Sequence, residues 1–469
     1  MANPRFSWRG PVVALQGVSL IFWLTAAVLT LAFLFGGASR QNLAQVMFLE
    51  LASLPLLALA VWRFVTEGRW ASLGAARLIL ALLPLIPLLQ LLPVPFGLWA
   101  ELPGHAAAAE AARLAGLPPA WRPISLAPQE TWRSLLALAP PIAVFLGAAL
   151  TTEAERRWLC VLVPVAAVVS LAIGALQLAG GQTSPFYFYS QTNLGSPVGL
   201  FSNRNHQATL LVVSMPFATL WLCRARAGIR ESAPMAAALI GQIMLALVGL
   251  VIVGSRAGAL LAAPALLMVT AMLVRAGRLG GRVSLIVGGL VLAVSIGAAS
   301  LVIDPLMQRF AARSDQRFDT APVVAATAWE HQPIGAGIGS FPSVYAGAEP
   351  VELMSETYFN HAHNDYLEIW LETGVLGVFA LLAFVVWWVG RSYRVWTLPT
   401  TPGRNLARAG SAAILLLLIH SVVDYPTRTL ALASVLALSC ALLAGRPAEF
   451  GPEAEAAADR AGSRRRRAS

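Results

Sequence analysis

The sequence contains no lysine and few charged residues of any kind. All 33 of its basic residues are arginine, and charged residues make up only 12% of the 469 positions. Soluble domains are typically about 25% charged, whereas this chain is 57% hydrophobic and has a mean hydropathy of +0.69. These values exclude an ordinary soluble domain and indicate a membrane protein. We interpret the exclusive use of arginine first as genomic base composition and second as a preference for bidentate anion binding.

Cysteine is also scarce, and several sequence motifs are missing. Cys160, Cys223 and Cys440 each fall inside an apolar segment, with no spacing typical of a metal or redox site, so we expect no disulfide framework. The net charge of +10 does not indicate nucleic-acid binding, because the arginines lie in small groups between apolar runs. The sequence has no P-loop, no G-x-G-x-x-G, no H-E-x-x-H and no clustered carboxylates suited to Mg²⁺. We therefore expect no cofactor and no metal ion.

Long apolar runs dominate what is present. A helix needs about 20 mostly apolar residues to span a bilayer, and twelve runs approach that length. They lie near residues 13–36, 44–62, 76–93, 134–151, 158–179, 206–223, 234–253, 257–274, 283–303, 366–390, 406–422 and 428–445. The predicted fold class is an all-α polytopic membrane protein with about 12 transmembrane helices.

The arginines between these runs predict the orientation of the chain. Cytoplasmic loops are enriched in arginine, and if the N-terminus is cytoplasmic every inner segment holds at least two. These inner arginines are Arg5 and Arg9; Arg63, Arg69 and Arg77; Arg156 and Arg157; Arg224, Arg226 and Arg230; Arg275, Arg278 and Arg282; Arg391, Arg394, Arg404 and Arg408; and, in the tail, Arg446, Arg460 and Arg464 to Arg467. Both termini are thus predicted to be cytoplasmic. The first run is too long for a cleaved signal peptide.

The predicted spans divide the chain into four parts. Residues 1–303 hold transmembrane helices 1–9, with an outer loop at 93–133 whose "HAAAAEAARLAGLP" predicts a short interfacial helix. Residues 304–365 form a large outer loop, and residues 366–446 hold helices 10–12. The tail, 447–469, is predicted to be disordered and basic, with arginines beside anionic membrane lipids. Outer loops of this length usually carry function.

Titratable residues gather where the tenth span begins, in "HAHNDYLEIWLETGVLG". Asp365 with Glu368 three residues later is typical of a helix N-terminus, which places His363 on the aqueous rim. The positive end of the helix disfavours a protonated imidazole there, and a neutral imidazole is what a general base requires. Glu368 and Glu372 share one helical face, and we interpret them at least as readily as dipole partners and interface anchors as catalytic groups.

Arginines occupy two further outer positions. Arg204 and His206 lie in "FSNRNHQATLL" at the mouth of the sixth span, and Arg256 lies in the turn "VGSRAGAL" between the seventh and eighth. An arginine in a tight apolar turn needs an anionic partner, and no acidic residue in the neighbouring outer turns supplies one. A ligand anion such as a phosphate would suit the planar guanidinium.

These motifs together resemble the O-antigen ligase family. "HNDYLEIWLETGVLG" fits the family pattern H-[NSQ]-x9-G-x-x-[GTY] with His363, Asn364, Gly374 and Gly377. "PIGAGIGSFPSVY" resembles a segment of the family's large periplasmic loop, and "GSRAG" resembles its arginine turn. The resemblance is specific from about Gly195 to Gly377, with "PISLAPQETWRSLLALAP" also typical of the family.

The resemblance implies a GT-C-type glycosyltransferase of the bacterial inner membrane with a periplasmic active site. Its members transfer a glycan from undecaprenyl diphosphate to an acceptor hydroxyl, on a lipopolysaccharide core or another glycan, with inversion and without a metal ion. By this resemblance His363 is the base that takes the acceptor proton. Arg204 and Arg256 bind the donor diphosphate, and Arg133 at the outer end of the fourth span is a weaker candidate for the same role.

Several alternatives stay open from the sequence. His361 precedes His363 by two residues and His206 lies on the same predicted face, so either histidine could share the role of base. A repeat-unit polymerase and a protein O-oligosaccharyltransferase would show the same motifs. An anion transporter using Arg204 and Arg256 is less favoured, because transporter sites lie near the middle of the membrane. An inactive structural subunit is disfavoured by the intact set of His363 and arginines.

Overall fold

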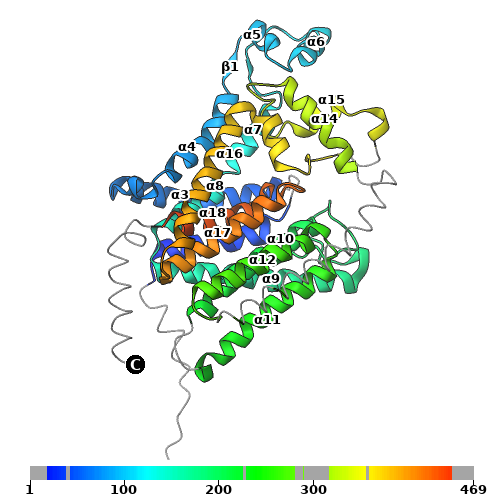
Figure 1. Cartoon of the computed structure of the whole chain (residues 1–469). Coiled ribbons are helices and arrows are strands. Elements are labelled where there is room, and N and C mark those ends of the chain that lie inside the picture. The colour runs from blue at the N-terminus through cyan, green and yellow to red at the C-terminus, as the bar shows by residue number, and fades with distance from the viewer. Residues whose placement is uncertain are drawn as a thin grey trace, which may run out of the picture.

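A computed structural model describes residues 18–38, 43–224, 229–279, 316–354 and 359–445, together with the isolated positions 282 and 289. The described chain is almost entirely helical (Figure 1), and its two strands are only two residues long. The all-α prediction is therefore confirmed for this part of the chain. The predicted span at 283–303 and the tail at 447–469 lie outside the described residues.

A bundle of helices forms most of the molecule. Their bounds are α2 Leu20–Phe35, α3 Leu43–Thr66, α4 Ala76–Gln90, α8 Ala139–Leu150, α9 Glu153–Gly180, α10 Arg204–Arg224, α11 Ile229–Val253, α12 Arg256–Arg275, α16 Asp365–Thr397, α17 Pro402–His420 and α18 Leu430–Ala444. Within the described residues, six helical segments are long and apolar enough to cross a membrane, and four apolar helices are shorter. The total of 12 spans stays a prediction.

Helix α10 lies at the centre of the bundle. It packs against α9, α11, α12 and α17, and 89% of its most apolar stretch is buried. A helix buried on every side is expected to be apolar all round, yet α10 buries several polar side chains. Those with no more than 8% exposure include Asn205, His206, Gln207, Thr209, Ser214 and Thr219. These buried polar groups need partners from neighbouring elements, and near the N-terminal end of α10 Asn205 and Thr209 have such partners in Asp424 and His420.

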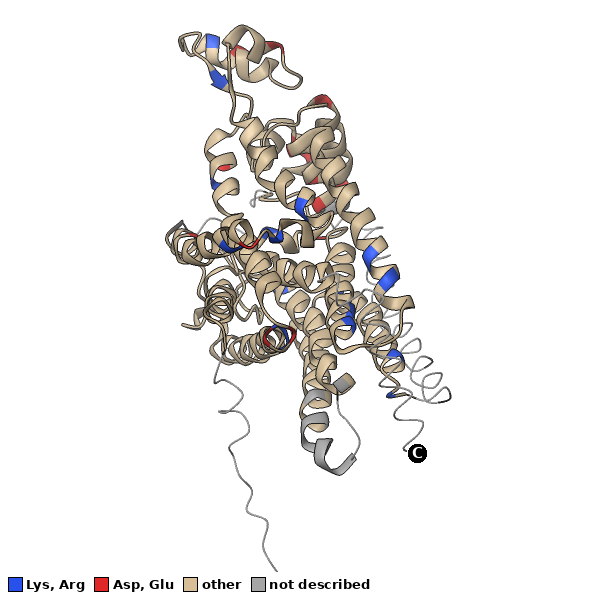
Figure 2. Ribbon diagram, turned by 90° about the vertical axis from the view of Figure 1, so that its left-hand side faces the viewer, with Lys and Arg blue, Asp and Glu red and all other residues tan. Residues whose placement is uncertain are grey.

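One end of the bundle carries an additional group of short elements, here called the outer end (Figure 1). It contains α5 (Phe96–Glu101), α6 (Ala106–Leu114), α7 (Pro128–Leu136), α14 (Gln316–Glu330) and α15 (Phe341–Ala348). The strands β1 (Pro93–Val94) and β2 (Arg122–Pro123) pair antiparallel below α5 and α6. Charged residues are sparse along most of the bundle, and acidic residues gather mainly toward the outer end (Figure 2).

The helix predicted within the loop 93–133 is present as α6. The fourth predicted span, 134–151, is two consecutive helices, α7 and α8, that together begin six residues earlier, at Pro128. The two helices meet just before Pro140 and Pro141, because proline cannot donate the hydrogen bonds that a continuous helix requires. Residues 304–315 and 355–358 of the second predicted loop lie outside the described residues.

The glycine-rich loop at residues 333–340 packs against a break in α16. The helix is interrupted at Gly374, which has φ +59°, and the backbone N–H of Val375 bonds instead to the carbonyl of Pro333 at 2.9 Å. The N–H groups of Ala336 and Gly337 bond to carbonyls on the other side of the break, each at 2.9 Å. A Cβ at Gly374 would lie 2.2 Å from the Pro333 oxygen, so only glycine allows this backbone contact. The contact fixes the first two turns of α16 against the outer end.

Candidate active site

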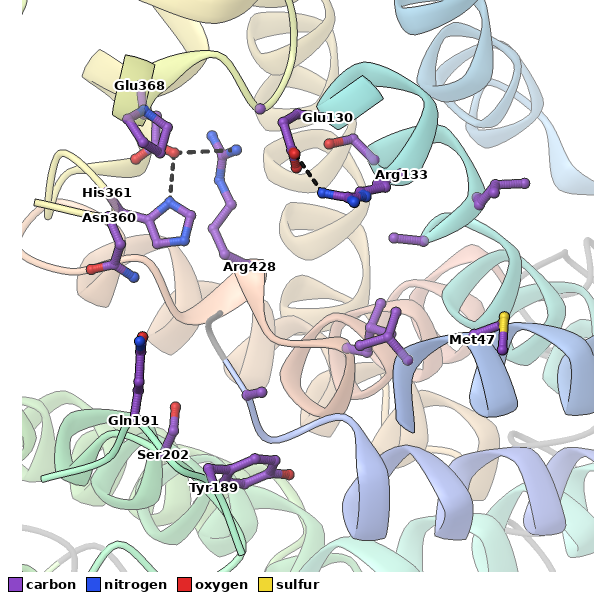
Figure 3. A pocket seen from close by; sticks show the side chains of 18 of the residues that line it. Met47, Glu130, Arg133, Tyr189, Gln191, Ser202, Asn360, His361, Glu368 and Arg428 are labelled. Atoms are coloured by element: carbon purple, nitrogen blue, oxygen red, sulfur yellow. Dashed lines mark hydrogen bonds and ion pairs between the residues drawn. The ribbon is translucent and has the colours of Figure 1, made fainter. Parts of the chain in front are cut away.

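A cavity of about 930 Å³ opens at the outer end of the bundle. Its walls come from α3, α7, the loop before α10, the segment after α15, the start of α16 and the turn between α17 and α18. Figure 3 shows His361, Glu368 and Arg428 on one side and Glu130 with Arg133 on the other. The other labelled lining residues are Met47, Tyr189, Gln191, Ser202 and Asn360.

Arg428 is the centre of a buried ionic cluster on the cavity wall. Its guanidinium lies 2.9 Å from Glu372, 3.3 Å from Asp365 and 3.4 Å from Glu368. The Glu368 and Glu372 side chains are each only 1% exposed. Burial alone would lower the pKa of Arg428, but the three carboxylates raise it, so this side chain stays charged.

This cluster corrects our interpretation of the acidic residues on α16. Glu368 and Glu372 are not interface anchors, because both carboxylates point inward and are fully engaged. Glu372 also accepts hydrogen bonds from the backbone N–H groups of Gly339 and Phe341, at 2.9 and 3.2 Å. It therefore ties α16 to the start of α15 as well as to Arg428.

His361 is held on the cavity wall by Glu368. Its Nδ1 lies 2.7 Å from Oε1 of Glu368, and the other carboxylate oxygen accepts from the backbone N–H of Ala362 at 2.8 Å. A carboxylate accepts but does not donate when it is ionised, so this contact places the proton of His361 on Nδ1. The ring orientation is thereby fixed, with Nε2 on the side away from Glu368.

His363 adopts an unusual backbone conformation. Its φ of +52° is the only positive value among the described residues other than glycine, and such conformations cost energy and occur often at functional sites. Its Nδ1 donates to the carbonyl of His361 at 3.0 Å. Since a carbonyl can only accept, Nδ1 carries the proton and Nε2 is the basic nitrogen, which is the tautomer that a general base requires.

The N-cap of α16 differs from the sequence prediction. Asn364, not Asp365, caps the helix, because its side-chain oxygen accepts from the N–H groups of Tyr366 and Leu367 at 3.0 and 3.1 Å. Asp365 instead points inward to Arg428 and accepts from Ser421 Oγ at 2.8 Å. The helix still begins within one residue of the predicted position.

Arg204 and Arg256 each begin a helix, and those two helix ends lie side by side. Ser255 caps α12 by accepting from the N–H of Gly258 at 3.1 Å, and its hydroxyl donates to Asn205 Oδ1 of α10 at 2.9 Å. Each partner in this bond is next in sequence to one of the arginines. Neither arginine forms an ion pair with any residue that the structure describes. Two helix N-termini carry partial positive charge, so the pair forms an electropositive surface, here called the arginine platform.

His206 lies beneath this surface. The sequence predicts its imidazole on the outer face beside Arg204, but the side chain is 0% exposed and is buried among the neighbouring helices. Its Nε2 lies 3.7 Å from Asp424, which is also 0% exposed. His206 is therefore a buried partner of Asp424 in this structure and does not line the cavity.

Arg133 is the one predicted anion-binding residue that lines the cavity. It lies in α7 and pairs with Glu130 one helical turn earlier, at 2.5 Å. Arg204 and Arg256 are not among the residues that line the cavity. No group of three or more metal-ligating side chains occurs within the described parts of the chain.

Sequence reasoning missed three residues between α17 and α18. Asp424, Tyr425 and Arg428 lie in the stretch "SVVDYPTRT", and the predicted twelfth span, beginning at 428, absorbed the arginine. Helix α18 begins two residues later, at Leu430, so Arg428 lies in the turn. The signal was the presence of both an acid and a base in a short outer turn between two apolar runs.

Comparison with known proteins identifies the central part of the chain. A family model described as O-antigen ligase matches residues 241–382. These residues form a domain of the O-antigen ligase family. The O-antigen ligase domain includes Arg256, His363 and the Gly374 break, while Arg204 and Arg428 lie outside the matched span. Among curated proteins, none is significantly similar to the chain. The family and the apolar helices together indicate a multi-pass membrane protein of a glycan-transferring ligase or polymerase type.

Proposed function

We propose that this protein is a glycosyltransferase of the bacterial inner membrane that transfers a glycan from undecaprenyl diphosphate to an acceptor hydroxyl. The acceptor is a lipopolysaccharide core or another glycan, and the outer end faces the periplasm. The acceptor oxygen attacks the anomeric carbon as the bond from that carbon to the diphosphate oxygen breaks. Undecaprenyl diphosphate leaves, and attack from the opposite face inverts the anomeric centre.

The observation that carries this proposal is the state of His363. Its Nδ1 donates to a carbonyl, so Nε2 is the unprotonated nitrogen, which is the one that can accept the proton that the acceptor hydroxyl loses. His363 also lies within the matched domain, in a strained conformation that the surrounding structure has to maintain. His361 shares the loop but is engaged with Glu368, and we assign it to the cavity wall.

The arginine platform is proposed to bind the donor diphosphate. Arg204 and Arg256, with two helix N-termini, supply positive charge and N–H donors for the charge that develops on the leaving group. In this proposal the arginines neutralise the diphosphate without a metal ion. Arg133 is a weaker candidate, because its guanidinium is already paired with Glu130.

The proposal is tested by replacing the two neighbouring histidines separately. We expect His363→Ala to lower the transfer rate by about 10²- to 10⁴-fold, the range of general-base catalysis. The matched variant His361→Ala removes an imidazole two residues away and should retain far more activity. The assay is glycan transfer by the purified protein from undecaprenyl-diphosphate-linked donor to acceptor. Full activity of His363→Ala would refute the assigned base.

A gene deletion separates ligase from repeat-unit polymerase. A strain lacking the gene, complemented with wild type or His363→Ala, is compared on gels of surface lipopolysaccharide and released polysaccharide. Loss of the O-antigen ladder with long carrier-linked chains still present supports a ligase. Loss of all long chains, with single repeat units left, supports the polymerase alternative. An unchanged profile contradicts both.

A further inference from the structure

The turn between α17 and α18 connects His363 with the arginine platform. We propose that Asp424 and Tyr425 in this turn are positioning residues that fix the base relative to the donor diphosphate. This inference rests on the proposed function, since it assumes that His363 and the platform act on one substrate. Neither residue was assigned a role by the sequence, and both lie outside the matched domain.

Tyr425 packs against three imidazoles at once. Its ring centroid lies 4.3 Å from that of His361, 5.0 Å from that of His363 and 5.1 Å from that of His206. The side chain is 3% exposed, and its hydroxyl accepts from Asn203 Nδ2 at 3.5 Å. His363 also packs against Phe359, at 5.8 Å. The ring of Tyr425 is therefore the surface on which the two histidines of the motif rest.

Asp424 holds the platform side of the same turn. One of its oxygens accepts from Asn205 Nδ2 at 2.5 Å, and the other accepts from the N–H of Tyr425 at 2.9 Å. Asn205 is the residue after Arg204, and its own side-chain oxygen accepts from Ser255, the cap of α12. A single buried carboxylate thus orders the first turns of both arginine-bearing helices.

Two buried histidines lie close to Asp424. His206 and His420 lie 3.7 and 3.9 Å from its two oxygens, and Nδ1 of His420 lies 2.6 Å from the Thr209 hydroxyl. Buried charges are stable only when they are paired and hydrogen-bonded. Asp424 meets this requirement through its hydrogen bonds to Asn205 and to the N–H of Tyr425, and the two histidines pack beside it without lining the cavity.

The start of α16 is fixed to the same turn from the other side. The N–H of Asp365 bonds to the carbonyl of Ser421 at 2.9 Å, and the hydroxyls of Ser421 and Thr427 donate to the Asp365 carboxylate at 2.8 and 3.1 Å. The loop that carries His361 and His363 ends at Asp365, the first residue of α16. A continuous path of buried contacts therefore runs from Ser255 through Asp424 and Tyr425 to His363.

The effect of breaking this path is measurable as a loss of turnover. A misplacement of about 1 Å can cost about 100-fold in rate, so we expect Tyr425→Leu to lower kcat by about that factor. The donor KM should change little, because the platform is held by Asp424. Tyr425→Phe keeps the ring and should restore kcat to within a few-fold of wild type. Asp424→Ala should instead raise the donor KM, because both arginine-bearing helix ends lose their common partner.

A matched control separates positioning from general loss of stability. Phe64→Leu removes a fully buried ring in α3 that packs on Trp70 at 5.0 Å, about 25 Å along the helix from the cavity residue Met47. It should lower stability without changing kcat or KM of the folded enzyme. Equal kcat losses in Phe64→Leu and Tyr425→Leu, or no rescue by Tyr425→Phe, would overturn the inference.

A second readout does not depend on catalysis. Diethylpyrocarbonate modifies accessible imidazoles, and mass spectrometry reports the rate at His361 and His363 separately. Tyr425→Leu should raise both rates several-fold, whereas Tyr425→Phe and Phe64→Leu should not. If the wild-type protein transfers no glycan, the proposed function is refuted. The modification rates of His361 and His363 then test separately whether Tyr425 positions these histidines. Rates unchanged in Tyr425→Leu would refute the role of the ring.

Discussion

Replacing Arg428 with methionine tests the ionic cluster at the cavity wall. Methionine keeps most of the side-chain volume but removes the positive charge shared by Asp365, Glu368 and Glu372. Breaking a buried ion pair by removing one partner typically costs about 3–5 kcal/mol, because the remaining charge stays buried without compensation. Arg428→Met leaves three such carboxylates.

Each of the three carboxylates keeps other contacts, which limit the loss of stability. Glu372 keeps two backbone N–H donors, Glu368 keeps His361 and the N–H of Ala362, and Asp365 keeps the hydroxyls of Ser421 and Thr427. We therefore expect the free energy of unfolding to fall by about 3–5 kcal/mol in total, the value for one broken pair, and not by three times that amount.

The measurement is a double-mutant cycle with Glu372→Gln. Glutamine keeps an oxygen that accepts from Gly339 and Phe341 but carries no charge. In the Arg428→Met background, Glu372→Gln should raise the free energy of unfolding by about 2 kcal/mol. In the wild-type background, the same substitution should lower it by about 1–3 kcal/mol. Unfolding in detergent is followed through the fluorescence of the 14 tryptophans. A loss below about 1 kcal/mol for Arg428→Met, or strictly additive variants, would refute the reasoning.

Three further predictions concern single positions. Gly374→Ala should destabilise the protein by about 1–3 kcal/mol in the same assay, because its Cβ would meet the Pro333 oxygen at 2.2 Å; an unchanged melting curve would contradict this. Arg256→Lys keeps the charge but loses the bidentate geometry, so the donor KM should rise about tenfold in the transfer assay, and an unaltered KM would count against the platform. Burial would raise the pKa of Asp424, but the surrounding imidazoles hold it well below its usual range. The stabilisation that ionised Asp424 contributes is thus present above about pH 4 and lost as pH falls below it, so the difference in stability between wild type and Asp424→Asn should narrow in acid.

The sequence predicts the helices well because each long apolar run carries its own signal. The start of α16 is found within one residue, and the motif glycine at 374 has a clear physical role in the fold. The spacing of Asp365, Glu368 and Glu372 even indicates one helical face. It does not indicate what that face meets, because Arg428 is 56 to 63 positions away and the pairing depends on how helices pack.

The histidines show the same limit. Motif spacing predicts His363 as the candidate base, and the hydrogen bond of its Nδ1 spans only two residues of the chain, to the carbonyl of His361. The burial of His206 depends on Tyr425 and Asp424, which are more than 200 positions away in the chain. A histidine near the end of a predicted span can face water or a neighbouring helix, and only the packing decides between them.

The docking of the glycine-rich loop on the break in α16 has a consequence for how the site can diversify. The loop and the helix recognise each other through main-chain groups, at Pro333, Ala336, Gly337 and Val375. Side chains around the contact between the loop and α16 can therefore be exchanged without losing these main-chain hydrogen bonds, provided that Gly374 remains. A frame defined by backbone atoms allows the cavity walls to change while His363, the proposed base, keeps its position.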